Sequence, residues 1–179
     1  MRVLVLGGIR SGKSRWAEDA ITQLAGSGQP VSYVATGSRG PVGADADWTA
    51  RVEAHRRRRP AHWYTVETGD VADRLRSDPT TATLVDDVGG WLTSVMDRRG
   101  AWSGAAVGVD VDELVDAVGG FRSPLALVSP EVGLTVVPAS AAGRRFADEL
   151  GTLNQRLAAA CDRVVLVVAG QPITLKDGV

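Results

Sequence analysis

Cysteine and histidine are scarce in this sequence, and their scarcity limits the chemistry that the chain can perform. Its 179 residues include one cysteine and two histidines. A single thiol, that of Cys161, forms neither a disulfide within the chain nor a cysteine-rich metal cluster, which fits a reducing compartment. Because Cys161 follows a short alanine run at the end of a predicted helix, we interpret it as a small packed residue rather than a reactive one.

Excess charge and long apolar runs are also absent. The 20 basic and 21 acidic residues leave a formal net charge of −1, so the total charge gives no sign of a nucleic-acid partner. The longest apolar run, Val164–Ala169, is far too short to span a membrane, and the N-terminal residues lack the pattern of a secretory signal. We therefore expect a cytoplasmic protein with one domain over residues 1–179, no membrane span and no nucleic-acid partner.

Short apolar runs rich in β-branched residues alternate with helical patterns along the chain. This alternation predicts an α/β fold with a mostly parallel sheet and helices on both of its faces. The predicted strands are Arg2–Leu6, Val31–Thr36, His62–Glu67, Ala82–Asp86, Leu125–Ser129, Arg163–Ala169 and Ile173–Lys176. The predicted helices are Lys13–Ala25, Asp47–Arg59, Val71–Ser77, Gly90–Arg98, Asp112–Phe121 and Ser140–Cys161. The least regular stretches are expected at Ser38–Ala46, Gly100–Asp110 and Pro130–Ala139.

A glycine-rich motif lies between the first predicted strand and the first predicted helix. Its glycines allow successive backbone N–H groups to surround an anion, and the helix N-terminus adds a positive dipole end. In this pattern the lysine reaches the β- and γ-phosphates, and the serine hydroxyl coordinates Mg²⁺. We therefore predict a P-loop for a nucleoside triphosphate, with Lys13 catalytic and Ser14 a metal ligand. Its candidate nucleotide-binding residues are Gly7, Gly8, Ile9, Arg10, Ser11, Gly12, Lys13 and Ser14.

Two adjacent carboxylates follow the strand predicted at Ala82–Asp86. A P-loop enzyme needs an acidic partner for Mg²⁺ at the end of a strand, and Asp86 and Asp87 stand at that position. Asp86 is the preferred metal ligand and a candidate catalytic residue, with Asp87 as the second choice. One of the two can instead cap the next helix.

The third feature is a histidine beside a run of arginines. His55 precedes four arginines, and Pro60 ends the predicted helix. Arginines hold phosphates through charge-assisted and often bidentate hydrogen bonds. A neutral imidazole among them can attack phosphorus, and the positive neighbours help to keep it unprotonated. The same run can also be a solvated face or a nucleic-acid patch, although it is short and the total charge does not support nucleic-acid binding.

Two other residues near this run have open roles. His62 opens a strand-like alternation and is more typical of a structural or positioning residue than of a nucleophile. Glu67 ends the same strand, where it can accept hydrogen bonds from a base or ribose or simply face solvent.

Several segments in a fixed order resemble one enzyme family over nearly the whole chain. The P-loop is common to many families, whereas the histidine segment, E-V-G-L-T-V-V-P and L-N-Q-R-L-A in this order are specific. Together the segments are similar to the bifunctional adenosylcobinamide kinase / adenosylcobinamide-phosphate guanylyltransferase family of cobalamin biosynthesis. They are Gly7–Ser14, Tyr33–Gly37, Arg51–Trp63, Leu84–Asp87, Trp91–Ser94, Glu131–Pro138, Arg144–Ala158 and Val164–Gly170.

The resemblance implies a RecA-like P-loop fold, a homotrimer and two reactions on a corrinoid substrate. ATP or GTP phosphorylates the aminopropanol hydroxyl of adenosylcobinamide, and GTP then transfers GMP to that phosphate through a guanylyl-histidine. His55 matches the histidine that carries GMP, with Mg²⁺ as the metal. Besides the P-loop, the nucleotide-binding residues expected from the motifs are Ala35, Thr36, Gly37, Arg56, Arg58, Arg59, Pro60 and Glu67.

The sequence departs from the family pattern at a few positions near the expected acceptor. Asp87 stands where a cysteine is common, Pro130 replaces an asparagine, and Thr135 replaces a glycine. Gly89 and Gly90 stand where bulkier residues are usual. These departures leave the P-loop and His55 intact, so guanylyl transfer is the safer of the two expected activities.

Two other functions fit the residues. A small-molecule kinase would use the P-loop without a covalent nucleotide, and a nucleotide-dependent switch would bind a partner through its arginines. Only the bifunctional transferase needs His55 to carry GMP. The general base of the kinase step stays open among Asp86, Asp87 and Glu131.

Overall fold

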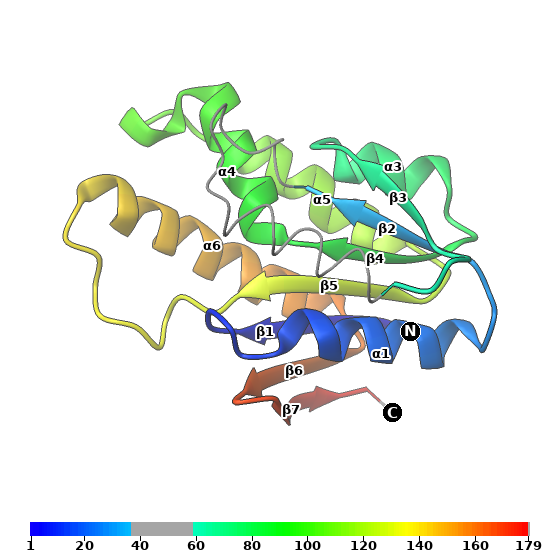
Figure 1. Cartoon of the computed structure of the whole chain (residues 1–179). Coiled ribbons are helices and arrows are strands. Elements are labelled where there is room, and N and C mark those ends of the chain that lie inside the picture. Colours follow the sequence, from blue (N-terminus) through cyan, green and yellow to red (C-terminus); the bar gives the residue numbers. More distant parts are fainter. Residues whose placement is uncertain (37–58, 179) are drawn as a thin grey trace.

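The computed structural model describes residues 1–36 and 59–178, and these form one seven-stranded sheet (Figure 1). The strand order is β3-β2-β4-β5-β1-β6-β7. Neighbouring strands run parallel except for the antiparallel pair β6 and β7. The strands are β1 (Arg2–Gly7), β2 (Val31–Ala35), β3 (Tyr64–Glu67), β4 (Ala82–Asp86), β5 (Leu125–Pro130), β6 (Arg163–Val168) and β7 (Gln171–Asp177).

Helices cover both faces of the sheet (Figure 1). Helix α1 packs on one face, and α4, α5 and α6 pack on the other, each face with its own apolar core. The helices are α1 (Lys13–Ala25), α3 (Val71–Ser77), α4 (Val88–Arg99), α5 (Gly108–Gly120) and α6 (Ala141–Ala160), with a 3₁₀ turn η1 at Ala101–Ser103. No helix in the described ranges is long and apolar enough to cross a membrane.

Strand β1 shows why the central strands are almost continuously apolar. Successive side chains of a strand point to opposite faces, so Val3 and Val5 pack with α1 while Leu4 and Leu6 pack in the core under α4, α5 and α6. Burial on both faces is what a parallel sheet requires. The predicted α/β fold with a mostly parallel, doubly covered sheet is therefore confirmed.

Several predicted boundaries were wrong by a few residues. Helix α4 begins at Val88 rather than Gly90, because the Asp87 side chain accepts a hydrogen bond from the Gly90 N–H and caps the helix. Helix α5 begins at Gly108, within a stretch that we expected to be irregular. Strand β3 begins at Tyr64 rather than His62. The expected loop at 38–46 and helix at 47–59 lie outside the described residues, apart from Arg59.

Candidate nucleotide site

The P-loop joins the end of β1 to the start of α1 through a tightly bent backbone. Gly12 has a φ of 95°, a left-handed conformation that glycine adopts without strain. A Cβ atom there would also lie 3.2 Å from the Cα of Gly170. Gly12 is therefore required both by its backbone conformation and by close contact with the turn between β6 and β7.

Two neighbouring strands fix the P-loop from outside. The Gly170 N–H donates to the Ser11 carbonyl at 2.8 Å, and the Glu131 N–H donates to the Gly7 carbonyl at 3.1 Å. A Cβ atom on Gly7 would lie 2.8 Å from the Val167 carbonyl oxygen. The ends of β5 and β6 thus hold the loop in shape. We had predicted no role for Gly170, although it ends one of the segments that resemble the family.

The lysine of the P-loop lies over its own loop. The Lys13 ammonium donates to the Gly8 carbonyl at 3.2 Å, and the Lys13 N–H donates to the Ser11 hydroxyl oxygen at 3.3 Å. Ser14 follows in the first turn of α1 and is half-buried. The Lys13 side chain and the loop backbone therefore lie together where the motif predicts the phosphates, with Ser14 in the adjoining turn of α1.

The two aspartates after β4 have different partners. The Tyr33 hydroxyl of β2 donates to Oδ2 of Asp86 at 2.7 Å. Asp87 instead caps α4 through its bond from Gly90, and its carbonyl accepts a hydrogen bond from the Thr36 hydroxyl. Of the two predicted roles for this pair, the cap therefore belongs to Asp87. This leaves Asp86 as the better candidate for the metal.

Burial and neighbouring charges shift the pKa values in this corner of the sheet. Burial raises the pKa of Asp87, the Asp86 carboxylate raises it further, and the Gly90 N–H and the Lys13 ammonium oppose the rise. Burial, followed by the charge of Asp86, also raises the pKa of Tyr33 far above its usual value. The phenol therefore stays protonated and remains a donor to Asp86. The effect of Lys13 on Asp87 places the P-loop and the end of β4 in one electrostatic environment.

Arg59, the last member of the arginine run, lies against the same tyrosine. Its guanidinium carbon is 3.2 Å from the centroid of the Tyr33 ring, a cation–π arrangement. Its Nη1 donates to the Thr65 hydroxyl on β3 at 3.0 Å. Arg59 therefore joins β2 and β3, one side chain away from Asp86. Tyr33 belongs to one of the segments that resemble the family, but the sequence alone did not indicate that it connects Arg59 to Asp86.

Residues 3–175 match the model of a family described as cobinamide kinase / cobinamide phosphate guanyltransferase. The chain belongs to this family. The bifunctional adenosylcobalamin biosynthesis protein CobP of Pseudomonas aeruginosa is 41% identical in an alignment of 181 positions that covers 98% of each protein. The bifunctional adenosylcobalamin biosynthesis protein CobU of Escherichia coli is 35% identical, over 98% of this chain and all 100% of that protein.

Among solved structures, the chain is similar to the P4 protein of bacteriophage phi6 in complex with ADP. The TM-score is 0.46 at 16% identity, and the match covers 96% of this chain and 52% of that protein. A likeness of this degree adds nothing to the family assignment, which rests on sequence.

Some of the other nucleotide-binding residues predicted for this cobinamide kinase / guanyltransferase lie near Asp86 or before and at the end of β3, and the rest lie outside the described residues. Ala35 ends β2 beside Asp86, and the N–H of Thr36, the next residue, donates to the Asp86 carbonyl at 3.3 Å. Glu67 ends β3 opposite Ala35 and is exposed. Pro60 accepts a hydrogen bond from the Trp63 N–H in the turn before β3. The remaining predicted residues, Gly37, His55, Arg56 and Arg58, lie outside the described residues.

Two departures from the family pattern explain one another in the structure. A Cβ atom on Gly89 would lie 2.8 Å from Cγ and 3.0 Å from Cδ of Pro130. The proline ring at the end of β5 therefore occupies the space that a side chain at position 89 would need. Gly89 and Pro130 therefore form a matched pair.

The donors at this edge suit magnesium. Ser14 offers a hydroxyl oxygen and Asp86 a carboxylate, and Mg²⁺ prefers oxygen ligands. Among the residues that the structure describes, no group of three or more His, Cys, Asp and Glu side chains could hold a metal by itself. Mg²⁺ commonly takes one or two carboxylates together with substrate phosphates and water. The donor set therefore fits a magnesium ion that is bound jointly with the nucleotide.

Proposed function

We propose that this chain phosphorylates adenosylcobinamide with ATP or GTP and transfers GMP from GTP to the resulting phosphate. The products of the second reaction are adenosylcobinamide-GDP and pyrophosphate. The observation that carries the proposal is the P-loop whose Lys13 ammonium lies near enough to Asp87 to lower its pKa, next to Asp86 at the end of β4, in a chain that matches the family over residues 3–175. We further propose that residues 1–179 act as one domain, in the cytoplasm and as a homotrimer. The trimer rests on the resemblance alone.

The kinase step relies on positioning and charge. The loop N–H groups cradle the phosphates, and the Lys13 ammonium neutralises charge on the β- and γ-phosphates. Ser14 and Asp86 would hold Mg²⁺, which supplies further neutralisation of the phosphate charge when it is bound. The acceptor hydroxyl oxygen bonds to the γ-phosphorus while the bond to the leaving diphosphate breaks.

The hydroxyl proton of the kinase step needs a base. The raised pKa of Asp87 makes its carboxylate a stronger base than an ordinary aspartate, but that carboxylate also caps α4. The Glu131 carboxylate accepts a hydrogen bond from the Gly133 N–H at 2.6 Å, so it holds its own loop. The candidates for this base are Asp86, Asp87 and Glu131.

Guanylyl transfer proceeds through His55 in this proposal. An imidazole nitrogen attacks the α-phosphorus of GTP, a P–N bond forms, and the P–O bond to pyrophosphate breaks. An oxygen of the acceptor phosphate then attacks the same phosphorus, and the P–N bond breaks to release the histidine. Arg56, Arg58 and Arg59 would neutralise the phosphates, with Gly37, Pro60 and Glu67 also contacting the nucleotide.

The proposed function is tested by following both products in time. Purified protein receives Mg²⁺, ATP, GTP and adenosylcobinamide, and the corrinoids are separated by chromatography. We expect the phosphate to appear first and the GDP derivative second. If only the phosphate forms, the chain is a small-molecule kinase. If neither forms while nucleotide stays tightly bound, it is a nucleotide-dependent switch.

A further inference from the structure

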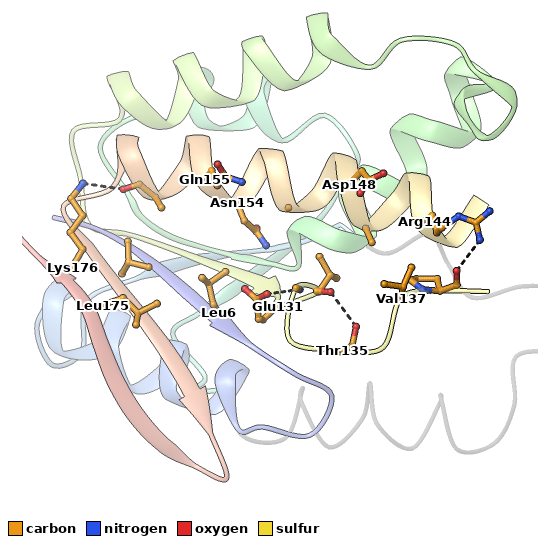
Figure 2. A pocket seen from close by; sticks show the side chains of 17 residues that line it. Leu6, Glu131, Thr135, Val137, Arg144, Asp148, Asn154, Gln155, Leu175 and Lys176 are labelled. Atoms are coloured by element: carbon orange, nitrogen blue, oxygen red, sulfur yellow. Dashed lines mark hydrogen bonds between the residues drawn. The ribbon is translucent and has the colours of Figure 1, made fainter. Parts of the chain in front are cut away.

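A hollow lies on the face of the sheet opposite α1 and encloses about 620 Å³, a size typical of small-molecule sites. Figure 2 shows α6 on one side, the loop between β5 and α6 on another, and β7 on the third. Leu6 and Val164 also line it. The hollow, called here the α6 pocket, is lined mainly by aliphatic side chains and by the polar residues Glu131, Arg144, Asp148, Asn154, Gln155 and Lys176.

The α6 pocket begins where the P-loop begins. Leu6 lines the pocket and directly precedes Gly7, the first residue of the P-loop. Glu131 lines it too, and its backbone N–H is bonded to the Gly7 carbonyl at 3.1 Å. A ligand in the pocket can therefore extend a hydroxyl group along β5 to the edge where the phosphates bind.

Helix α6 presents different faces to the core and to this pocket. Leu150, Leu153 and Leu157 are buried in the core, whereas the pocket is lined by small residues of the helix, among them Ala147 and Gly151. Glycine is a poor residue for the interior of a helix, and a Cβ atom on Gly151 would meet nothing within 4 Å. Packing therefore does not require this glycine, and its effect is to widen the pocket.

Hydrogen bonds fix the walls and leave two polar groups for a ligand. Asn154 bonds Ser129 at 2.6 Å and the Pro130 carbonyl at 3.0 Å, and the Lys176 ammonium bonds the Cys161 carbonyl at 2.6 Å. Gln155 and Asp148 line the pocket without a side-chain hydrogen bond to any described residue. An amide and a carboxylate on an apolar wall suit a ligand that carries both methyl and carboxamide groups.

Three large apolar side chains are exposed on the loop at the mouth of the pocket. Leu134, Val136 and Val137 are 76%, 92% and 73% exposed, and they follow one another closely between β5 and α6. Clustered apolar exposure of this kind marks binding surfaces. Because Val137 also lines the pocket, the exposed loop and the pocket form one continuous apolar surface.

We propose that the α6 pocket binds the corrinoid acceptor, an inference that rests on the proposed function. A corrin macrocycle carries methyl groups and carboxamide arms around its periphery, which matches apolar walls interrupted by Gln155 and Asp148. Part of the macrocycle enters the pocket, and the rest lies against Leu134 and Val136. Its hydroxyl arm points past Glu131 toward the P-loop.

The test narrows the pocket with a residue that the helix tolerates. Gly151→Leu places a side chain in open space and improves helix propensity, so we expect its melting temperature to be at or above that of the wild type. The matched control is Gly119→Leu on α5, where a Cβ atom also meets nothing within 4 Å. Equilibrium dialysis with adenosylcobinamide should show a Kd raised by about tenfold or more in Gly151→Leu and unchanged in the control.

Each outcome decides the inference. Unchanged corrinoid affinity in Gly151→Leu overturns the inference. If Gly151→Leu keeps its corrinoid affinity but changes its oligomeric mass by light scattering, the pocket belongs instead to a contact with a second copy of the chain. Wild-type protein that binds no corrinoid overturns the inference as well. If the wild type binds corrinoid but forms neither product, the proposed function fails while the Kd of Gly151→Leu still decides the pocket.

Discussion

The pKa values of the aspartates at the two ends of the sheet are shifted in opposite directions. At the nucleotide end, burial raises the pKa of Asp87. At the other end, hydrogen bonds from Arg2 lower the pKa of Asp162 to about 2, with a side-chain contact of 2.7 Å to the guanidinium. The Asp162 carboxylate is held by the Arg2 guanidinium, whereas the buried Asp87 carboxylate lies near the Asp86 carboxylate, which raises its pKa further, and near the Lys13 ammonium, which opposes the rise. The charged form is therefore favoured at Asp162 and disfavoured at Asp87, so we expect the ionic contribution to stability at neutral pH to come from Asp162.

We expect the largest effect from a substitution that removes a carboxylate charge at the nucleotide end. Asp86→Asn keeps the size of the side chain and a partner for Tyr33 but weakens the metal site, so we expect kcat for corrinoid phosphorylation to fall by about 10²- to 10³-fold. Asp116→Asn on α5 is the control and should leave kcat unchanged. If kcat of Asp86→Asn falls by less than about threefold, Asp86 is excluded as the metal ligand, because the loss of a ligand should cost far more.

The next effect tests the matched pair at the same end. Gly89→Ala forces a Cβ atom against the Pro130 ring, and we expect a loss of about 1–3 kcal/mol in the free energy of unfolding by urea. Gly89→Ala with Pro130→Ala should recover most of the loss because the ring is gone. Equal stabilities of the single and double variants would contradict the pairing.

A smaller effect concerns the hydroxyl that holds Asp86. Tyr33→Phe removes the donor 2.7 Å from Asp86 and keeps the ring beneath Arg59. Partners that orient metal ligands typically change metal affinity by 10- to 100-fold, so we expect the Mg²⁺ concentration for half-maximal activity to rise by about tenfold. At saturating Mg²⁺ the rate should recover. A lower rate with an unchanged Mg²⁺ requirement would mean that Tyr33 acts only through packing.

We expect the smallest effect from removing the Asp162 carboxylate at the opposite end of the sheet. The pKa of Asp162 is lower in the folded chain than its ordinary value of 3.8, so its stabilisation is present above about pH 4 and is lost as the pH falls through about 2. The pair is partly exposed, at 25% and 36%, which limits its worth to about 1 kcal/mol. Asp162→Asn should therefore unfold more easily at pH 7, and the difference should shrink toward pH 2. A constant difference would contradict the ionic account.

Local patterns predicted the parts of the molecule that depend on neighbouring residues. The P-loop and the carboxylates after β4 could be read directly, because strand, loop and helix are contiguous in the sequence. Contacts between distant segments could not be predicted: Tyr33 meets Asp86 across two strands, and Glu131 meets Gly7 through the pairing of β5 with β1. The α6 pocket also has no local signature, because residues from β1, the loop after β5, α6, β6 and β7 line it.

The central claim is that His55 carries GMP during guanylyl transfer. The most direct measurement incubates the protein with Mg²⁺ and GTP labelled at the α-phosphorus, denatures it, and measures label on the chain. We predict label that is lost in acid and kept in base, as a P–N bond requires, that is absent in His55→Ala and present in His62→Ala. An unlabelled wild-type chain that still consumes GTP labelled at the γ-phosphorus would contradict the covalent mechanism.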